Sequence, residues 1–283
     1  MNTLKKFPST RPRRNRLDSW GRRLTAENTL STSDLILPLF ILDGKKKKEE
    51  ILSMPGVFRY SLDKLLLEIE TIVQKNIPLI ALFPNIEQNL KDTSGSEALN
   101  YNGLVPRAIS AIKKEFPELG VMTDIALDPY TSHGQDGIVD DNGYVLNDET
   151  VEILKKQALL HAEMGVDIVA PSDMMDGRIG VIREALEKQS HSLTRIMAYS
   201  AKYASSFYSP FRDAVGSSKS LSGYDKQNYQ MNPSNSDEAL LEVELDISEG
   251  ADMVMIKPGL PYLDIIQKIK MNFKIPTFAY QVS

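Results

Sequence analysis

The 283-residue chain has 42% apolar and 25% charged residues, proportions typical of a globular protein, and a formal net charge of −5. That charge gives no general attraction for nucleic acid. The chain has no cysteine, which excludes disulfides and thiolate metal sites and fits a reducing cytoplasm. The longest apolar run, residues 35–42, is too short to cross a bilayer, and the first residues lack the apolar core of a signal peptide. We therefore expect a cytoplasmic protein that binds neither nucleic acid nor membrane.

Short apolar runs alternate with amphipathic segments along most of the chain. The apolar runs lack the alternation of a half-exposed strand, which is typical of strands buried on both faces of a parallel sheet. The segments between them have the length and spacing of helices that cover such a sheet. We predict strands at residues 35–40, 79–83, 121–126, 167–170, 195–199, 253–256 and 277–281. We predict helices at residues 62–74, 105–116, 149–164, 179–189, 236–249 and 262–273.

Strict alternation of strand and helix predicts an α/β fold, and the number of units favours a (β/α)8 TIM barrel over an open sheet. The count is one strand short, and the sequence stops just after the seventh strand. We therefore expect a C-terminally truncated chain whose last strand and helices are missing; the alternative is a seven-stranded or open α/β domain. We expect a basic N-terminal arm at residues 1–30 that makes oligomer contacts, and an incomplete TIM-barrel catalytic domain at residues 31–283.

Two lysines stand where predicted buried strands end. Lys202 follows the strand at residues 195–199, and Lys257 ends the apolar run of residues 253–257. An amine attacks a carbonyl only when unprotonated, so its pKa must fall from about 10.4 toward neutrality. Apolar surroundings and a second ammonium group nearby both lower it. One such lysine is more often a surface residue with its ammonium in water, but two at neighbouring strand ends indicate a reaction that holds two carbonyl substrates covalently.

Carboxylates gather at or beyond the end of the third predicted strand, at Asp124, Asp128 and Asp136, and Ser172 follows the fourth strand. In a barrel, the loops after the strands surround the catalytic face, so these residues can orient the lysines or transfer protons. Oxygen ligands without sulfur favour Mg²⁺ or another hard cation over zinc. A turn-forming role for the aspartates is the alternative.

Two cations, Arg212 and Lys226, lie in the long polar segment of residues 200–234. Loops of this length in a compact domain are usually functional lids or disordered. Cations on a lid can clamp a substrate carboxylate and exclude water on closure. On the residues alone, a solvated loop with scattered charges is an equal alternative. The arginines of residues 11–16 favour an arm that embraces a neighbouring subunit over a nucleic-acid site, because the whole chain is acidic.

Six motifs resemble those of one enzyme family, the porphobilinogen synthases, also called 5-aminolevulinate dehydratases. They stand in the family's order, and the match runs from the basic arm to the last residue, which makes the resemblance highly specific. The motifs are Ser-Met-Pro-Gly-Val (53–57), Asp-Pro-Tyr-Thr-Ser-His-Gly (128–134), Pro-Ser-Asp-Met-Met-Asp-Gly-Arg (171–178), Lys-Tyr-Ala-Ser-Ser-Phe-Tyr (202–208), Tyr-Gln-Met-Asn-Pro (229–233) and Lys-Pro-Gly-Leu-Pro-Tyr-Leu-Asp (257–264).

The resemblance implies a (β/α)8 barrel that condenses two 5-aminolevulinate molecules to porphobilinogen with loss of two waters, an early step of tetrapyrrole and haem biosynthesis. By position, it implies that Lys202 holds the first substrate as a Schiff base and that Lys257 holds the second. Arg212 and Lys226 match lid cations that bind one substrate carboxylate. Ser283 matches a serine that helps to bind the other carboxylate.

The resemblance also implies metals and an assembly. Zinc-dependent members carry three cysteines at positions that are Ala126, Asp128 and Asp136 in this chain. The chain therefore resembles the zinc-independent, aspartate-rich bacterial type, whose active site would hold Mg²⁺, a monovalent cation or no metal. Glu242 matches a glutamate that holds an allosteric Mg²⁺ at a subunit interface. The family implies homo-octamers built from arm-hugging dimers and favoured by Mg²⁺.

The C-terminus departs from the family pattern, because members continue with a further strand, helices and a carboxylate-binding tyrosine. We therefore expect an open barrel with an exposed sheet edge, and a polypeptide of low stability or weak activity. Two alternative functions stay open: an aldolase-like barrel enzyme that forms a Schiff base on one lysine, and a non-catalytic, truncated assembly subunit. The paired lysines and lid cations argue against the first.

Overall fold

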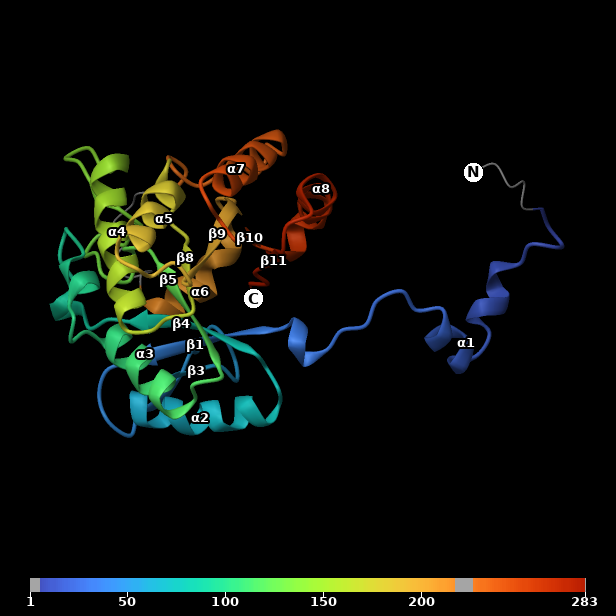
Figure 1. Cartoon of the computed structure of the whole chain (residues 1–283), viewed down its shortest axis with the longest axis horizontal. Helices are drawn as coiled ribbons and strands as arrows, with labels where there is room; N and C mark the ends of the chain where they lie inside the picture. The colour runs from blue at the N-terminus through green and yellow to red at the C-terminus, as the bar shows by residue number, and fades with distance from the viewer. Residues whose placement is uncertain (1–5, 217–225, 283) are drawn as a thin grey trace.

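A computed structural model describes residues 6–216 and 226–282 of the chain. Its centre is a curved sheet in which seven parallel strands, here called the barrel strands, are joined by helices packed against the sheet (Figure 1). Barrel strands that follow one another along the chain are neighbours in the sheet, as successive strand–helix–strand units require. The predicted α/β barrel architecture is confirmed. The barrel strands are β1 (Ile36–Leu42), β4 (Leu79–Asn85), β5 (Gly120–Ile125), β8 (Ile168–Pro171), β9 (Arg195–Lys202), β10 (Met253–Lys257) and β11 (Thr277–Ala279).

Every connection between successive barrel strands contains a helix, and the six main helices begin within two residues of their predicted starts. A short helix, α6, follows β9 in the segment that was predicted to be a polar loop. The helices of the barrel are α2 (Leu62–Gln74), α3 (Leu104–Glu115), α4 (Asn147–Glu163), α5 (Arg178–Lys188), α6 (Ser209–Val215), α7 (Asp237–Ser248) and α8 (Leu263–Phe273). The short strands are β2 (Lys48–Glu50) and β3 (Phe58–Tyr60), which continue the main sheet beyond β1, and the separate pair β6 (Ile138–Val139) and β7 (Val145–Leu146).

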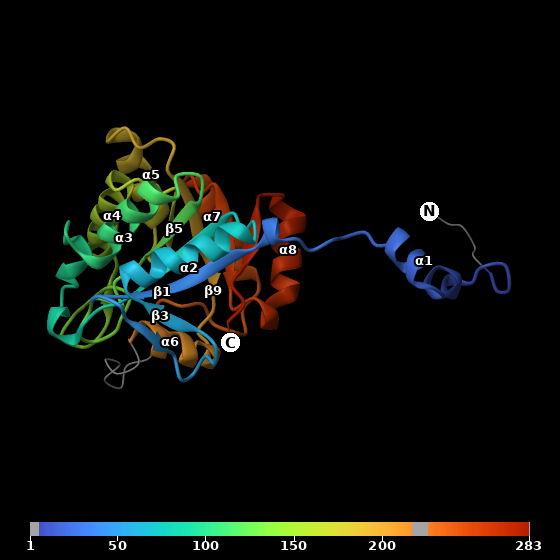
Figure 2. The same cartoon turned by 90° about the horizontal axis from the view of Figure 1, so that it is seen from below.

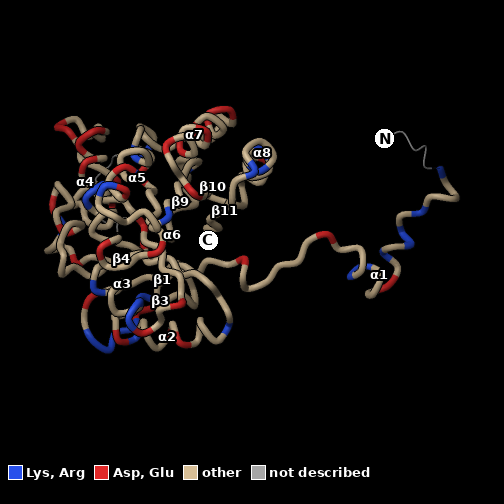
Figure 3. Tube along the Cα trace, viewed as in Figure 1, with Lys and Arg blue, Asp and Glu red and all other residues tan. Residues whose placement is uncertain are grey.

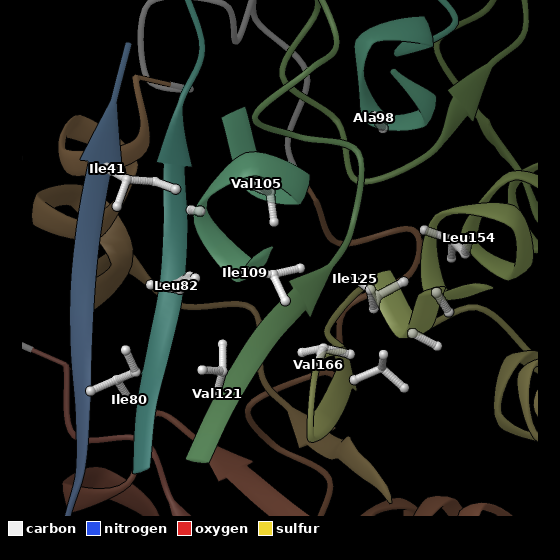
Figure 4. Close-up of a cluster of buried hydrophobic side chains, with 14 of the residues drawn as sticks. Ile41, Ile80, Leu82, Ala98, Val105, Ile109, Val121, Ile125, Leu154 and Val166 are labelled. Atoms are coloured by element: carbon white, nitrogen blue, oxygen red, sulfur yellow. The ribbon is translucent and has the colours of Figure 1, made fainter. Parts of the chain in front are cut away.

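Two apolar layers lie on opposite faces of the strands, as side-chain alternation requires. In β4, Ile80 and Leu82 belong to the layer beneath the helices, whereas Ala81 and Phe83 belong to the layer inside the barrel. Figure 4 shows the outer layer, in which branched side chains of β1, β4 and β5 meet those of α3 and α4. The labelled residues are Ile41, Ile80, Leu82, Ala98, Val105, Ile109, Val121, Ile125, Leu154 and Val166. Burial on both faces explains why these strands are apolar throughout.

The strands β1 and β11 stand at the two ends of the seven-strand order, and in the described residues no ladder joins them. A cavity of 620 Å³ lies between them, lined by Ile36 and Pro38 on one side and residues 277–281 on the other. This cavity is larger than the one around the two lysines, but its lining contains neither lysine. Its size therefore does not mark it as the site of the chemistry.

The residues before β1 run away from the barrel as an extended segment in both views (Figures 1 and 2). They contain a 3₁₀ turn at Pro12–Arg16 and the short helix α1 (Ser19–Leu24). Leu17, Trp20 and Leu24 are each more than 60% exposed. The described part of the arm thus presents apolar side chains that the barrel of the same chain does not cover. Within the described residues, no helix is both long and apolar enough to cross a membrane.

Candidate active site

Lys202 and Lys257 are the last residues of β9 and β10 and lie directly opposite each other in the strand register. The prediction that Lys202 lies beyond its strand is wrong, because β9 continues through Ser200, whose hydroxyl is buried and donates to the Ala198 carbonyl. Both lysines are almost fully buried, at 6% and 3% exposure. The fold therefore brings two amines together at the carboxyl ends of neighbouring strands, the catalytic face of a barrel.

A β-bulge in β9 gives Lys202 its inward direction. Ala198 pairs with Val254, but Ala201 pairs with Ile256, so β9 advances three residues where β10 advances two. Because side chains alternate along a strand, the extra residue changes the face on which every later side chain lies. The bulge thereby places Lys202 on the same face as the lysine of β10.

The Lys202 amine lies in a polar network. Its Nζ is 3.1 Å from Asp136 Oδ2 and also donates to the Ser172 carbonyl. The other oxygen of Asp136 accepts a hydrogen bond from Lys226 Nζ at 2.6 Å, and Asp128 lies 3.6 Å from that same amine. Although burial raises the pKa of Asp136, Lys202 and Lys226 lower it more, to about 2. Asp136 is therefore a fixed negative charge shared by two lysines.

Lys226 is suited to bind an anion rather than to attack a carbonyl. Burial lowers its pKa, but the carboxylates of Asp136 and Asp128 outweigh burial and raise it. Lys226 consequently stays an ammonium ion at neutral pH.

The Lys257 amine lies among aromatic rings. Its Nζ is 3.8 Å from the ring centre of Phe211, 4.2 Å from that of Tyr280, 5.4 Å from that of Tyr208 and 5.6 Å from that of Tyr199. No local sequence pattern indicates this enclosure, because the rings come from β9, the segment after it and the residues after β11. The aromatic residues near strand ends indicate an aromatic layer inside the barrel. They do not indicate that this layer surrounds the amine of Lys257.

Burial is the main cause that lowers the pKa of Lys257, and the positive charge of Lys202 adds to it; together they bring it to about 7. The ring faces attract an ammonium ion and partly oppose this change. An amine with a pKa near 7 is half unprotonated at neutral pH, so Lys257 meets the first requirement of a carbonyl nucleophile.

Two further carboxyl groups, those of Asp124 and Asp128, complete the polar side of the site. Burial, reinforced by the charge of Asp128, raises the pKa of Asp124 to about 6, and burial also raises the pKa of Asp128. Asp124 Oδ1 is buried and has no hydrogen-bond partner among the described atoms. A carboxyl group with a pKa near 6 can both accept and donate a proton at neutral pH.

Seven of the predicted residues line one small cavity of 20 Å³ at the mouth of the barrel. In this conformation the cavity is too small to hold two substrate molecules. Arg212 is one of them, and its guanidinium lies 5.9 Å from the ring centre of Tyr208. The predicted residues in the lining are Asp124, Asp128, Ser172, Lys202, Arg212, Lys226 and Lys257. Asp136 contacts two of the three lysines directly. Ser283 lies outside the described residues.

Glu242 lies in a different place, on α7, in a polar cavity of 320 Å³ that also contains Asp176 and Glu238. Figure 3 shows acidic residues gathered along this helix. Burial raises the pKa of Glu242 to about 7; Arg178 opposes that effect and Asp246 adds to it. Within the described residues, no three His, Cys, Asp or Glu side chains are arranged to hold a metal ion. Mg²⁺ at Glu242 would therefore depend on one or two carboxylates and water, a form of binding that Mg²⁺ tolerates.

A buried ion cluster between Glu242 and the lysines was not predicted from the sequence. Arg178 is fully buried, with its guanidinium nitrogens 3.2 Å from Asp246 and 3.5 Å from Asp173. It also donates to the Tyr199 carbonyl of β9. The signal available in the sequence was weak, because Arg178 follows a turn and opens a helix, where charged residues are usually solvated.

Comparisons with known proteins agree on one family. The Delta-aminolevulinic acid dehydratase family model matches residues 9–283. A protein of that name from Bradyrhizobium diazoefficiens is 60% identical over 96% of this chain and 77% of its own length. The corresponding protein of Chlamydia pneumoniae is 56% identical over 97% of this chain and 82% of its own length. A crystal structure of the Toxoplasma gondii enzyme, in complex with the reaction product porphobilinogen, superposes with a TM-score of 0.94 at 50% identity, covering 96% of this chain and 77% of that one.

The fold, with a charged cavity at the carboxyl ends of its strands, defines an α/β-barrel enzyme. The chain belongs to the Delta-aminolevulinic acid dehydratase family. Its activity is that of a porphobilinogen synthase, a hydro-lyase of tetrapyrrole biosynthesis. Because the chain has no cysteine, it has no zinc–cysteine site.

Proposed function

We propose that Lys202 and Lys257 each form a Schiff base with one 5-aminolevulinate molecule, Lys202 with the first and Lys257 with the second. The observation that carries this proposal is their direct pairing in the register of β9 and β10, with both amines buried at the barrel mouth. Two substrates bound to paired residues are held side by side, which turns a meeting of two molecules into an intramolecular step.

The proposed chemistry balances with two waters lost. Each lysine amine adds to a substrate ketone and releases one water, which forms an imine. The imines act as electron sinks while one carbon–carbon and one carbon–nitrogen bond form between the substrates. Both lysine amines are then displaced, which returns them to the free state with porphobilinogen as product. Asp124, whose pKa is about 6, suits the proton transfers, and Asp136 orients Lys202.

We propose that Arg212 and Lys226 bind a substrate carboxylate. Both line the cavity with the two reacting lysines, and Lys226 stays charged because of its aspartate partners. Asp128 and Ser172 line the same cavity. A corresponding role for Ser283 with the other carboxylate rests on the family resemblance alone.

We propose that the chain is of the zinc-independent, aspartate-rich type and works in the cytoplasm, which its lack of cysteine favours. The donor atoms present suit hard cations: Glu242 for an allosteric Mg²⁺, and the carboxylates of Asp124 and Asp128 for a second Mg²⁺ or a monovalent cation. The unpartnered Asp124 Oδ1 supports the second assignment. A bound cation would supply positive charge that favours the ionised carboxylates.

We propose that the chain assembles into a homo-octamer of dimers held together by their arms. The support is the exposure of Leu17, Trp20 and Leu24 on an arm that leaves its own barrel. Removal of residues 1–30 should reduce the mass measured by sedimentation. An unchanged mass would refute the role of the arm.

Trapping of the imines tests the central proposal. The protein is incubated with 5-aminolevulinate and sodium borohydride, and modified lysines are mapped by mass spectrometry. We expect reduced adducts on Lys202 and Lys257, and none on Lys226, which is buried nearby but held as an ammonium ion. Adducts on neither reacting lysine would refute the mechanism.

The metal proposal is tested on α7 with a matched pair of variants. Glu242→Ala should abolish the effect of Mg²⁺ on assembly size and activity. Glu244→Ala removes an exposed carboxylate from the same helix and should leave that response intact. A Mg²⁺ response that survives in Glu242→Ala would show that the ion binds elsewhere.

A further inference from the structure

The short helix α6 carries two side chains of the site. The ring centre of Phe211 lies 3.8 Å from the Nζ atom of Lys257, and Arg212 lines the cavity at the barrel mouth. A helix of seven residues is marginal on its own. Contacts from other parts of the chain must therefore determine where α6 lies.

Arg59 of β3 forms two hydrogen bonds with the C-terminal end of α6. Its Nε donates to the Ala214 carbonyl at 2.7 Å, and its Nη2 donates to the Asp213 carbonyl at 2.5 Å. The last carbonyls of a helix lack partners within the helix and form the negative end of its dipole, so a guanidinium ion is favourable there. Because the guanidinium is planar and rigid, two simultaneous bonds fix the orientation of the helix as well as its distance.

Two more side chains hold the same helix end. Asn85, the last residue of β4, donates to the Ala214 carbonyl at 3.3 Å, and Lys91 donates to the Gly216 carbonyl at 3.2 Å. Gly216 has a φ of +72°, and a Cβ atom there would lie 2.7 Å from Asn85 Nδ2. Only glycine allows the chain to turn this close to Asn85. We call Arg59, Asn85 and Lys91 the α6 clamp.

The remaining contacts of Phe211 with the barrel are apolar. Its ring centre lies 5.1 Å from that of Phe83 and 6.0 Å from that of Phe40, inside the barrel mouth. Apolar contacts stabilise the buried position of a side chain but depend little on its orientation. Hydrogen bonds, in contrast, weaken steeply as their angle departs from linearity. Apart from the hydrogen bonds that Ser53 Oγ donates to Asp213 Oδ2 and to the Pro210 carbonyl, the directional contacts of α6 therefore come from its clamped end.

We propose that Arg59 is a positioning residue of the reaction: by holding the Asp213 and Ala214 carbonyls, it sets the place of α6 and so keeps Phe211 against Lys257 and Arg212 at the substrate cavity. This inference rests on the proposed roles of Lys257 and Arg212. Arg59 itself lines neither the cavity nor the ring enclosure.

The test compares Arg59→Ala with Arg59→Lys and with Arg183→Ala. Arg183 also bonds a backbone carbonyl, that of Thr194, but at the opposite end of the strands. In Arg59→Ala we expect a rise of about tenfold in KM for 5-aminolevulinate and a fall of about tenfold in the borohydride-trapped fraction at Lys257. Arg59→Lys restores one of the two bonds and should recover part of both losses. Arg183→Ala should change the melting temperature alone.

Two results overturn the proposal: an unchanged KM and trapped fraction in folded Arg59→Ala, or losses that Arg183→Ala reproduces. If Arg59→Ala does not fold, the comparison of Arg59→Lys with the unchanged chain decides, with the same two readouts. Absence of an adduct on Lys257 in the unchanged chain refutes the lysine chemistry instead. In that case KM alone still decides the role of Arg59.

Discussion

The surroundings of Lys202 and Lys257 differ sharply, although the two residues are neighbours in one sheet. Lys202 contacts a buried carboxylate and a carbonyl, whereas the amine of Lys257 is surrounded by four aromatic rings. Only the second arrangement desolvates an amine without giving it an anionic partner in contact. The comparison indicates that this barrel mouth has a charged half and a dry half.

The difference suits a reaction with two unlike steps. The charged half, around Asp136, holds the amines of Lys202 and Lys226 in fixed positions and can bind the carboxylate of a substrate. The dry half lowers the pKa of Lys257 to about 7 and supplies a free amine. Residues of the charged half and of the dry half can be replaced separately, so the different roles of the two halves can be tested.

The largest expected effect is that of replacing the lysines themselves. Lys202→Met and Lys257→Met should each lower kcat by at least about 10³-fold, the scale on which loss of a covalent nucleophile acts. Their stabilities should change in opposite directions. Lys257→Met should raise the melting temperature because it removes a desolvated amine, and Lys202→Met should lower it because Asp136 loses a partner. Calorimetry beside steady-state kinetics measures both, and shifts of the same sign would contradict the two-half description.

The next effect concerns the carboxylate of the charged half. Asp136→Asn removes the buried charge that contacts the amines of Lys202 and Lys226 and should destabilise the protein by about 3 kcal/mol, with a loss of activity of about 100-fold. The control is Glu184→Gln, which removes an exposed partner of Lys188 and should leave the free energy of unfolding nearly unchanged. Chemical denaturation of both variants gives the comparison. Equal costs would mean that Asp136 is effectively solvated.

The pH dependence tests the dry half. Because the free amine is the nucleophile, kcat/KM should rise about tenfold per pH unit below a pKa of about 7 and level off above it. The folded pKa of Lys257 is lowered from 10.5, so between about pH 7 and 10.5 the unfolded chain binds more protons at this residue. The free energy of unfolding should consequently rise with pH across that window, and this part should vanish in Lys257→Met. A kinetic limb near pH 10 would exclude Lys257 as the desolvated nucleophile.

The smallest effect is expected for Tyr208→Phe. The Tyr208 hydroxyl donates to the Lys257 carbonyl at 2.8 Å, but the Tyr203 amide donates to the same oxygen at 2.9 Å. Since the carbonyl keeps one partner, the loss should be about 1 kcal/mol of stability, with activity within about tenfold of the unchanged chain. A larger fall in activity, measured at equal folded fraction, would indicate that Tyr208 takes part in the chemistry.

Much of the fold could be predicted because its signals are local. Apolar runs and helical spacing located the seven barrel strands and six helices within a few residues. The strand end at Lys202 was missed because Ser200 interrupts the apolar pattern, while in the structure it is buried and bonded to its own strand. Local polarity misleads wherever the backbone satisfies a buried hydroxyl.

The site was predictable where a residue follows a strand, and unpredictable where it acts from a distance. Lys257 and Asp124 could be found from their strands alone. Phe211 and Arg59 could not, because their contacts join segments separated by 46 residues in one case and by about 155 in the other. No periodicity within one element carries such information, which depends on the closed three-dimensional arrangement.

The bulge in β9 decides whether the barrel mouth has two amines or one. If β9 kept its present length but alternated strictly from Ala198 to Lys202, the side chain of Lys202 would turn outward, toward the helix layer. Every side chain of the site would still be present in the sequence, and only Lys257 would remain at the mouth. A relative could therefore lose the reaction through substitutions that remove the bulge, a change that no comparison of site residues would reveal.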